Sequence, residues 1–101
     1  MELHLDKGGN PWVLRPEGEM TIYAAAEIKQ PLLAALDGAP GLTLDLSRVE
    51  ELDTSGMQLL LLLAREARAA ALPFTLGEVS QAAAEALDLA HARGRLAGGA
   101  E

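Results

Sequence analysis

The residues of this chain best suited to chemistry are the consecutive Asp53, Thr54 and Ser55, which are followed by Gly56. A carboxylate beside two hydroxyl groups can cap the start of a helix, because side-chain oxygens accept hydrogen bonds from free backbone amides. The same place can accept a phosphate group, because those amides and the positive end of the helix dipole stabilise negative charge. The two uses are compatible, since one hydroxyl can cap a helix until it is phosphorylated.

Helix capping is the simpler interpretation of this segment. Ser55 and Gln58 have the spacing of a capping box, in which the serine oxygen accepts the amide of Gln58 and Gln58 reaches back. Asp53 or Thr54 could cap instead, and such a cap contributes about 0.5–2 kcal/mol. Phosphorylation would add a charge of about −1.5 to −2 next to Asp53 and would repel an acidic partner surface. The segment could therefore control binding.

The elements around this segment are those of an α/β domain. Residues 42–46 alternate apolar and polar side chains and predict a central strand, and residues 55–71 predict a long helix. The other predicted elements are a hairpin over residues 2–15, a turn at 16–18, a strand over 19–22, a helix over 24–36, a strand over 73–77 and a helix over 80–90. Pro31 is expected to kink or divide its helix. We expect a mixed sheet of four to five strands with three to four helices packed against it.

Length and composition limit the class of protein. The 101 residues are expected to form one domain over residues 1–93 and a flexible tail over residues 94–101. The net charge of −7 argues against a nucleic-acid-binding surface, which needs clustered Lys and Arg. The first residues carry charges that a signal peptide would lack. The longest apolar run, residues 59–64, is far shorter than the ~20 residues that span a bilayer. We expect a cytoplasmic protein without direct membrane insertion.

No catalytic site is predicted. Ser55 lacks the Gly-x-Ser-x-Gly pattern of a nucleophile elbow, and the candidate bases His4 and His91 lie near the two ends of the chain. Two histidines and no cysteine are too few ligands for an ordinary zinc site. Residues 8–10 form a turn without the spacing of a phosphate-binding loop. We therefore expect no catalytic residues, no cofactor and no metal.

The long helix carries two leucines outside its predicted buried face. The residues that share this face at helical spacing are Gly56, Leu60, Leu63, Ala64, Ala67 and Ala71. Leu62 lies on the opposite side and Leu61 at the boundary. An isolated surface leucine is common and needs no explanation. Alternatively, Leu61 and Leu62 begin a partner-binding surface one or two helical turns from residues 53–56.

Part of the chain resembles a known family. The segments that carry the resemblance are Leu42-Thr43-Leu44-Asp45-Leu46-Ser47, then Val49, then Leu52-Asp53-Thr54-Ser55-Gly56-Met57-Gln58-Leu59-Leu60. They resemble the signature of STAS domains, which include the anti-sigma factor antagonists, also called anti-anti-sigma factors. The predicted order of elements is similar to that family over most of the chain.

The resemblance implies a module of a bacterial partner-switching pathway that controls transcription. In such domains a Ser or Thr after the signature Asp is phosphorylated by a serine kinase that is also the anti-sigma factor. The unphosphorylated domain binds that kinase and releases the sigma factor, and a phosphatase resets it. Carried onto this chain, the resemblance implies Ser55 as first-choice phosphoacceptor and Thr54 as second, supported by Asp53 and Gly56.

Partner contacts are implied for the start of the following helix, at Met57, Gln58, Leu61 and Leu62. The implied partners are an anti-sigma factor or related signalling kinase, and the chain is expected to be a monomer or weak dimer. Residues 56–58 depart from the Gly-Leu-Gly of sporulation-type members and are similar to stand-alone STAS proteins. That similarity implies an alternative function as a non-phosphorylated adaptor of a chemotaxis or two-component system, or of a phospholipid-transport ABC complex. Nucleotide binding, reported for parts of the family, is a third and weaker possibility.

Overall fold

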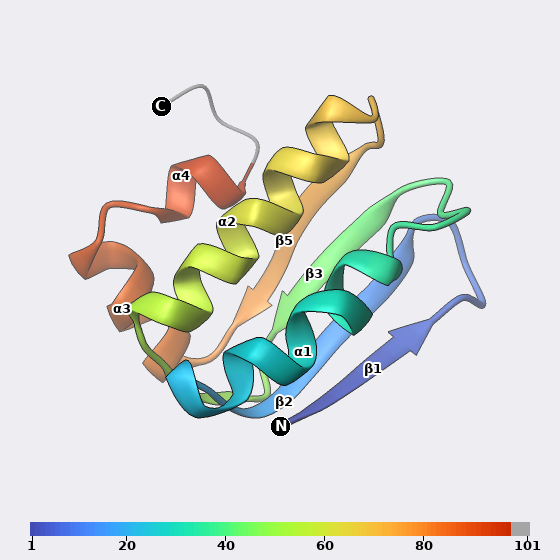
Figure 1. The fold of residues 1–101 in the computed structure, drawn as a ribbon. Helices are drawn as coiled ribbons and strands as arrows, with labels where there is room; N and C mark the ends of the chain where they lie inside the picture. The colour runs from blue at the N-terminus through green and yellow to red at the C-terminus, as the bar shows by residue number, and fades with distance from the viewer. Residues whose placement is uncertain (98–101) are drawn as a thin grey trace.

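The structure, a computed structural model that describes residues 1–97, is a five-stranded sheet covered by helices (Figure 1). In chain order its elements are β1 (Glu2–Asp6), β2 (Trp12–Met20), α1 (Ile22–Ala34), β3 (Leu42–Leu46), β4 (Val49–Leu52), α2 (Thr54–Ala69), β5 (Phe74–Val79), α3 (Gln81–Leu89) and α4 (Arg93–Leu96). The predicted class, a mixed sheet with helices packed against it, is confirmed.

The parallel part of the sheet decides where the helices begin. β1 pairs antiparallel with β2, and the order continues through β3 to β5, so β3 is central as predicted. The beginning of β2 pairs parallel with β3, and its end pairs parallel with β4. Because β2 and β4 finish side by side at Met20 and Leu52, the helices that follow them start at the same edge of the sheet.

Alternation along the strands and helical spacing along α2 build the core. In β3, Leu42, Leu44 and Leu46 are fully buried, whereas Thr43 and Asp45 lie on the other face. Figure 1 shows α1 and α2 lying across the buried face of the sheet. The buried residues of α2 are Gly56, Met57, Leu59, Leu60, Leu63, Ala64 and Ala67. These include the whole predicted face except Ala71, which follows the end of the helix and is exposed, and they add Met57 and Leu59 at its flanks.

The sheet differs from the predicted one at two places. The predicted turn at residues 16–18 is part of β2, which continues through Pro16 and Gly18 with an irregular register between Gly18 and Glu19. Pro16 is tolerated because it lies between the parts of β2 that pair with β3 and with β4, where its missing N–H is not needed. No strand was predicted for residues 47–52, which contain the short strand β4.

The helices also differ from the predicted ones. α1 begins at Ile22 rather than at residue 24 and is one helix with Pro31 inside it, not two. Pro31 is exposed, so its ring does not disturb the core. Gly94 to Leu96, predicted as tail, lie in α4 with Leu96 fully buried, and residues 98–101 of the predicted tail lie outside the described residues. None of the helices in the described range is long and apolar enough to cross a bilayer.

Candidate functional site

The carboxylate of Asp53 joins the first turns of α1 and α2. Its Oδ1 accepts a hydrogen bond from the backbone amide of Gly56 at 3.0 Å, and its Oδ2 accepts one from the amide of Ile22 at 2.9 Å. Asp53 is the N-cap of α2, whereas Thr21, the N-cap of α1, makes no capping bond with its side chain. One carboxylate therefore caps two helices, although Ile22 and Asp53 lie 31 residues apart in the sequence.

The backbone of Asp53 also forms a hydrogen bond at this junction. The amide of Asp53 donates to the carbonyl oxygen of Met20 at 3.3 Å, which ties the end of β2 to the end of β4. A Cβ atom on Gly56 would lie 2.2 Å from that carbonyl oxygen. Glycine is thus the residue that lets the first turn of α2 approach β2 so closely. The close packing of α2 against β2 therefore explains why a glycine stands directly after Thr54 and Ser55.

The predicted capping box of Ser55 and Gln58 is not formed. The amide of Gly56 is bonded to Asp53, which was one of the alternatives, and no hydrogen bond of the Ser55 or Gln58 side chain occurs within residues 1–97. Thr54 is exposed and Ser55 is half-buried at the surface. The cap therefore leaves the hydroxyl group of Ser55 available for another use.

The double cap also favours the ionised form of Asp53. The hydrogen bond from the Gly56 amide, followed by that from Ile22, lowers the pKa of the Asp53 carboxyl against the opposing effect of partial burial. Asp45 on the open face of the sheet behaves similarly. Partial burial would raise its pKa, but hydrogen bonds from Ser47 and the Arg15 guanidinium, 2.9 Å away, together lower it.

Stability should fall in acid partly because Asp53 becomes protonated. Its pKa is lower in the folded chain than in the unfolded chain, where it is about 3.9, so the unfolded chain binds the proton first. The stabilisation is complete above about pH 4 and is lost as the pH falls through the folded pKa. In urea unfolding, an Asp53→Asn variant should therefore differ less from the wild type at about pH 3 than at about pH 7. Asp45 titrates in both proteins and cancels, so an equal difference at the two pH values would contradict this role of Asp53.

A surface groove of about 940 Å³ runs from Ser55 between α1 and α2 toward α4. Three of the residues predicted to contact a partner, Gln58, Leu61 and Leu62, line it together with Ser55. Leu61 and Leu62 are both half-buried. The fourth predicted contact, Met57, does not line the groove, because its side chain faces the core and is 8% exposed.

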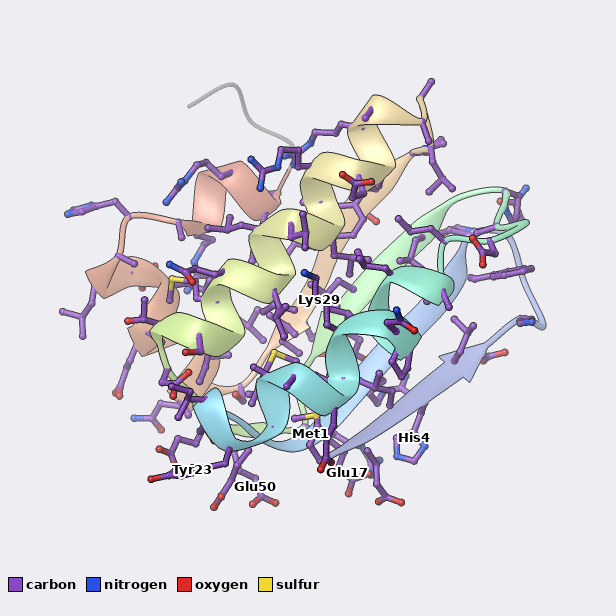
Figure 2. All side chains as sticks on the ribbon, viewed as in Figure 1. Met1, His4, Glu17, Tyr23, Lys29 and Glu50 are labelled. Carbon is purple, nitrogen blue, oxygen red and sulfur yellow. The ribbon has the colours of Figure 1, made fainter. Side chains whose placement is uncertain are left out.

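The groove also contains residues that were not predicted. Lys29 of α1 lines it, and Figure 2 shows the Lys29 side chain in the space between α1 and α2. Arg65 and Arg68 of α2 line its far half, and the Arg68 guanidinium donates to the backbone carbonyl oxygens of Arg95 and Leu96, which fastens α4 to α2. Arg65 and Arg68 follow Leu61 and Leu62 at helical spacing, and this pattern could have predicted them as residues of the same surface. Nothing local in the sequence places α1 alongside them.

One other cluster has the residue types of a metal site. Glu2 and His4 on β1 and Glu17 on β2 offer ligand atoms within 4.8 Å of one another. Figure 2 shows His4 and Glu17 near the edge strand β1, away from α2. His4 Nε2 and Glu17 Oε1 are already hydrogen-bonded to each other at 2.9 Å, which accounts for their proximity without an ion. The cluster has no connection to the groove or to Asp53.

Comparison with known families found a family model that matches almost the whole chain. The model described as "Mlab, STAS domain" matches residues 3–96, which run from β1 to the end of α4. The match thus includes both the junction around Asp53 and the groove. A search of curated proteins found no significant match.

Similar solved structures include two states of one anti-sigma factor antagonist. Unphosphorylated SpoIIAA has a TM-score of 0.73 and 21% identity, with 91% of this chain and 83% of that chain covered. Phosphorylated SpoIIAA of Bacillus has a TM-score of 0.68 and 21% identity, with 90% and 85% covered. A serine-to-glutamate variant of RsbS from Moorella thermoacetica has a TM-score of 0.67 and 27% identity, with 88% and 77% covered. The SpoIIAA likeness shows a shared fold.

Proposed function

This chain belongs to the STAS domain family, and we propose on that basis that it is a phosphorylation-controlled protein-interaction module of a bacterial partner-switching pathway. It acts in the cytoplasm as a binding module rather than as an enzyme. In its unphosphorylated form it binds an anti-sigma factor that is a serine kinase, or a related signalling kinase. Phosphorylation by that kinase releases it, and a phosphatase restores binding.

The observation that carries this proposal is that Ser55 lines the same groove as Leu61 and Leu62. Because Asp53 already caps α2, modification of the Ser55 hydroxyl costs the helix no capping bond. A phosphate there would be tolerated by the positive dipole of the first turn, although the amide of Gly56 is already bonded to Asp53. It would also place a charge of about −1.5 to −2 at one end of the groove. Thr54 lies outside the groove lining, which favours Ser55 as the acceptor.

Incubation with ATP and the kinase encoded beside this protein's gene should add one phosphate, located at Ser55 by mass spectrometry. Ser55→Ala should abolish the modification, and Thr54→Ala, which removes the neighbouring exposed hydroxyl, should leave it unchanged. Ser55→Asp should weaken binding to the same kinase by about tenfold or more, since a fixed charge then stands in the groove. No phosphate on either residue would contradict the proposal, and phosphate on Thr54 alone would identify Thr54 instead of Ser55 as the acceptor.

A second candidate is a constitutive adaptor that uses the groove without phosphorylation. It is favoured by Met57 and Gln58, which replace the Leu-Gly of sporulation-type members. Both candidates require the groove, so Leu62→Glu should abolish partner binding in either case. The adaptor alone predicts that Ser55→Asp and Ser55→Ala bind the partner as the wild type does.

A further inference from the structure

We infer that the groove between α1 and α2 binds an amphipathic helix of the partner protein whose polar side chains are acidic. The inference rests on the proposed function for the role of Ser55, which would control occupancy of the groove. It goes further by assigning the chemistry of the bound segment. Three features of the groove carry it: its charge, its apolar floor and the elements that form its walls.

The charge of the groove is opposite to that of the molecule. The chain has eight Lys and Arg residues and a net charge of −7. Four of the eight line this one groove, namely Lys29, Arg65, Arg68 and Arg95, and no Asp or Glu among residues 1–97 lines it. In the described part of the chain, none of these four forms a salt bridge with a carboxylate. A concentrated positive surface on an acidic protein selects a segment that carries carboxylates.

The floor of the groove is apolar, so charge alone does not describe what it binds. Leu61 and Leu62 are half-buried and lie beside Leu59 and Ala25, so an apolar strip separates Ser55 from the arginines. A purely polar segment would leave this strip in contact with water. Covering it stabilises a complex, because apolar surface is then removed from water. The occupant must therefore present apolar side chains between its acidic ones.

The walls of the groove favour a helix over an extended strand. Its lining residues in the described chain come from α1, α2 and α4, and none of them belongs to a strand. An extended peptide would find no row of backbone N–H and C=O groups to pair with, whereas a helix binds such a groove through side chains alone. The stretch of α2 from Ser55 to Arg68 is about 20 Å long at 1.5 Å per residue, so a bound helix of about 13 residues would match it.

Ser55 stands at the end of the groove opposite to Arg65 and Arg68 along α2. Its phosphate would face the carboxylates of the bound helix and reduce the positive potential that attracts them. Electrostatic repulsion in the shared groove, rather than a change of fold, would then release the partner.

Designed peptides of about 18 residues, long enough to exceed the groove, can test this chemistry. One peptide carries Leu at helical spacing with Glu at the other positions. A second has the same leucines with Lys in place of Glu, and a third has the first composition in scrambled order. By fluorescence anisotropy at low salt, the first should bind the unmodified protein at least about tenfold more tightly than the other two.

Charge-reversal variants locate the binding surface. Arg65→Glu should weaken binding of the acidic peptide by about tenfold, while Arg48→Glu, the same change at an exposed position outside the groove, should alter it less than about twofold. Leu62→Ser should also weaken it. Equal affinity for the ordered and scrambled peptides, or equal losses in Arg65→Glu and Arg48→Glu, would overturn the inference. Arg65-dependent flotation with phosphatidylglycerol vesicles, without selective binding of the acidic peptide, would overturn it in favour of a membrane surface.

Because the peptide assay uses unmodified protein, its outcome does not depend on any kinase. Selective binding without phosphorylation of Ser55 would keep this inference and remove the proposed switch. Phosphorylation of Ser55 without selective binding would keep the switch and remove the acidic helix. Ser55→Asp tests the connection between the switch and the acidic helix, and it should lower the affinity for the acidic peptide by several-fold.

Discussion

Replacing Gly56 by alanine is expected to lower the free energy of unfolding by about 3 kcal/mol or more. The new Cβ would lie 2.2 Å from the carbonyl oxygen of Met20, 2.7 Å from its Cγ and 2.9 Å from its carbonyl carbon. Two of these three atoms belong to the backbone. They cannot move away without disturbing the hydrogen bond from the Asp53 amide and the pairing of β2 with β4. Urea unfolding followed by circular dichroism measures the effect.

The sign of this effect makes the prediction specific. In an unobstructed helix, a change from glycine to alanine stabilises by about 0.5–1 kcal/mol, because alanine loses less conformational entropy. Gly9→Ala is a matched control, since the nearest atom to its added Cβ is 3.8 Å away and the change should stay within about 0.5 kcal/mol. A Gly56→Ala variant as stable as the wild type would show that α2 does not approach β2 this closely.

The sequence was a good guide wherever a local pattern determined the structure. The alternation in residues 42–46 correctly predicted a central strand, and the helical spacing after Gly56 correctly predicted the buried face of α2. β4 was missed because only Val49 and Leu52 of its four residues are buried, which breaks the alternation expected of a strand. β2 was divided because Pro16 and Gly18 read as a turn, although pairing on both sides keeps the strand extended.

The candidate site was only partly predictable from the sequence, because local patterns do not decide which residue caps α2. Local rules allow Asp53, Thr54 or Ser55 to cap a helix, and no neighbouring residue decides among them. The decision comes from Ile22, far away in the sequence, whose amide also needs an acceptor at this edge of the sheet. A carboxylate has two oxygens for two amides, whereas a hydroxyl has one. Tertiary structure thus selects Asp53 and leaves Ser55 unbonded.

Asp53→Ala is accordingly expected to lower the free energy of unfolding by about 2 kcal/mol, roughly the sum of two helix caps. The change leaves the amides of Ile22 and Gly56 without their acceptor, one at the start of each helix. Asp53→Asn should be intermediate, because the single amide oxygen can accept from one helix while its NH₂ group faces the donor of the other. Both changes are measured by urea unfolding at about pH 7, where Asp53 is ionised.

Ser80 provides the comparison, because its Oγ caps only α3, by accepting from the amide of Ala83 at 3.1 Å. Ser80→Ala removes this cap and a hydrogen bond that the same hydroxyl donates to Val49, so it should cost at least about 1 kcal/mol. If Asp53→Asn matched the wild type in stability, only one of the two amides would depend on Asp53. If Asp53→Asn and Asp53→Ala were equally destabilised, the negative charge would matter more than the number of acceptors. An intermediate Asp53→Asn is the outcome that requires one carboxylate to hold the starts of both helices, and with them the two walls of the groove beside Ser55.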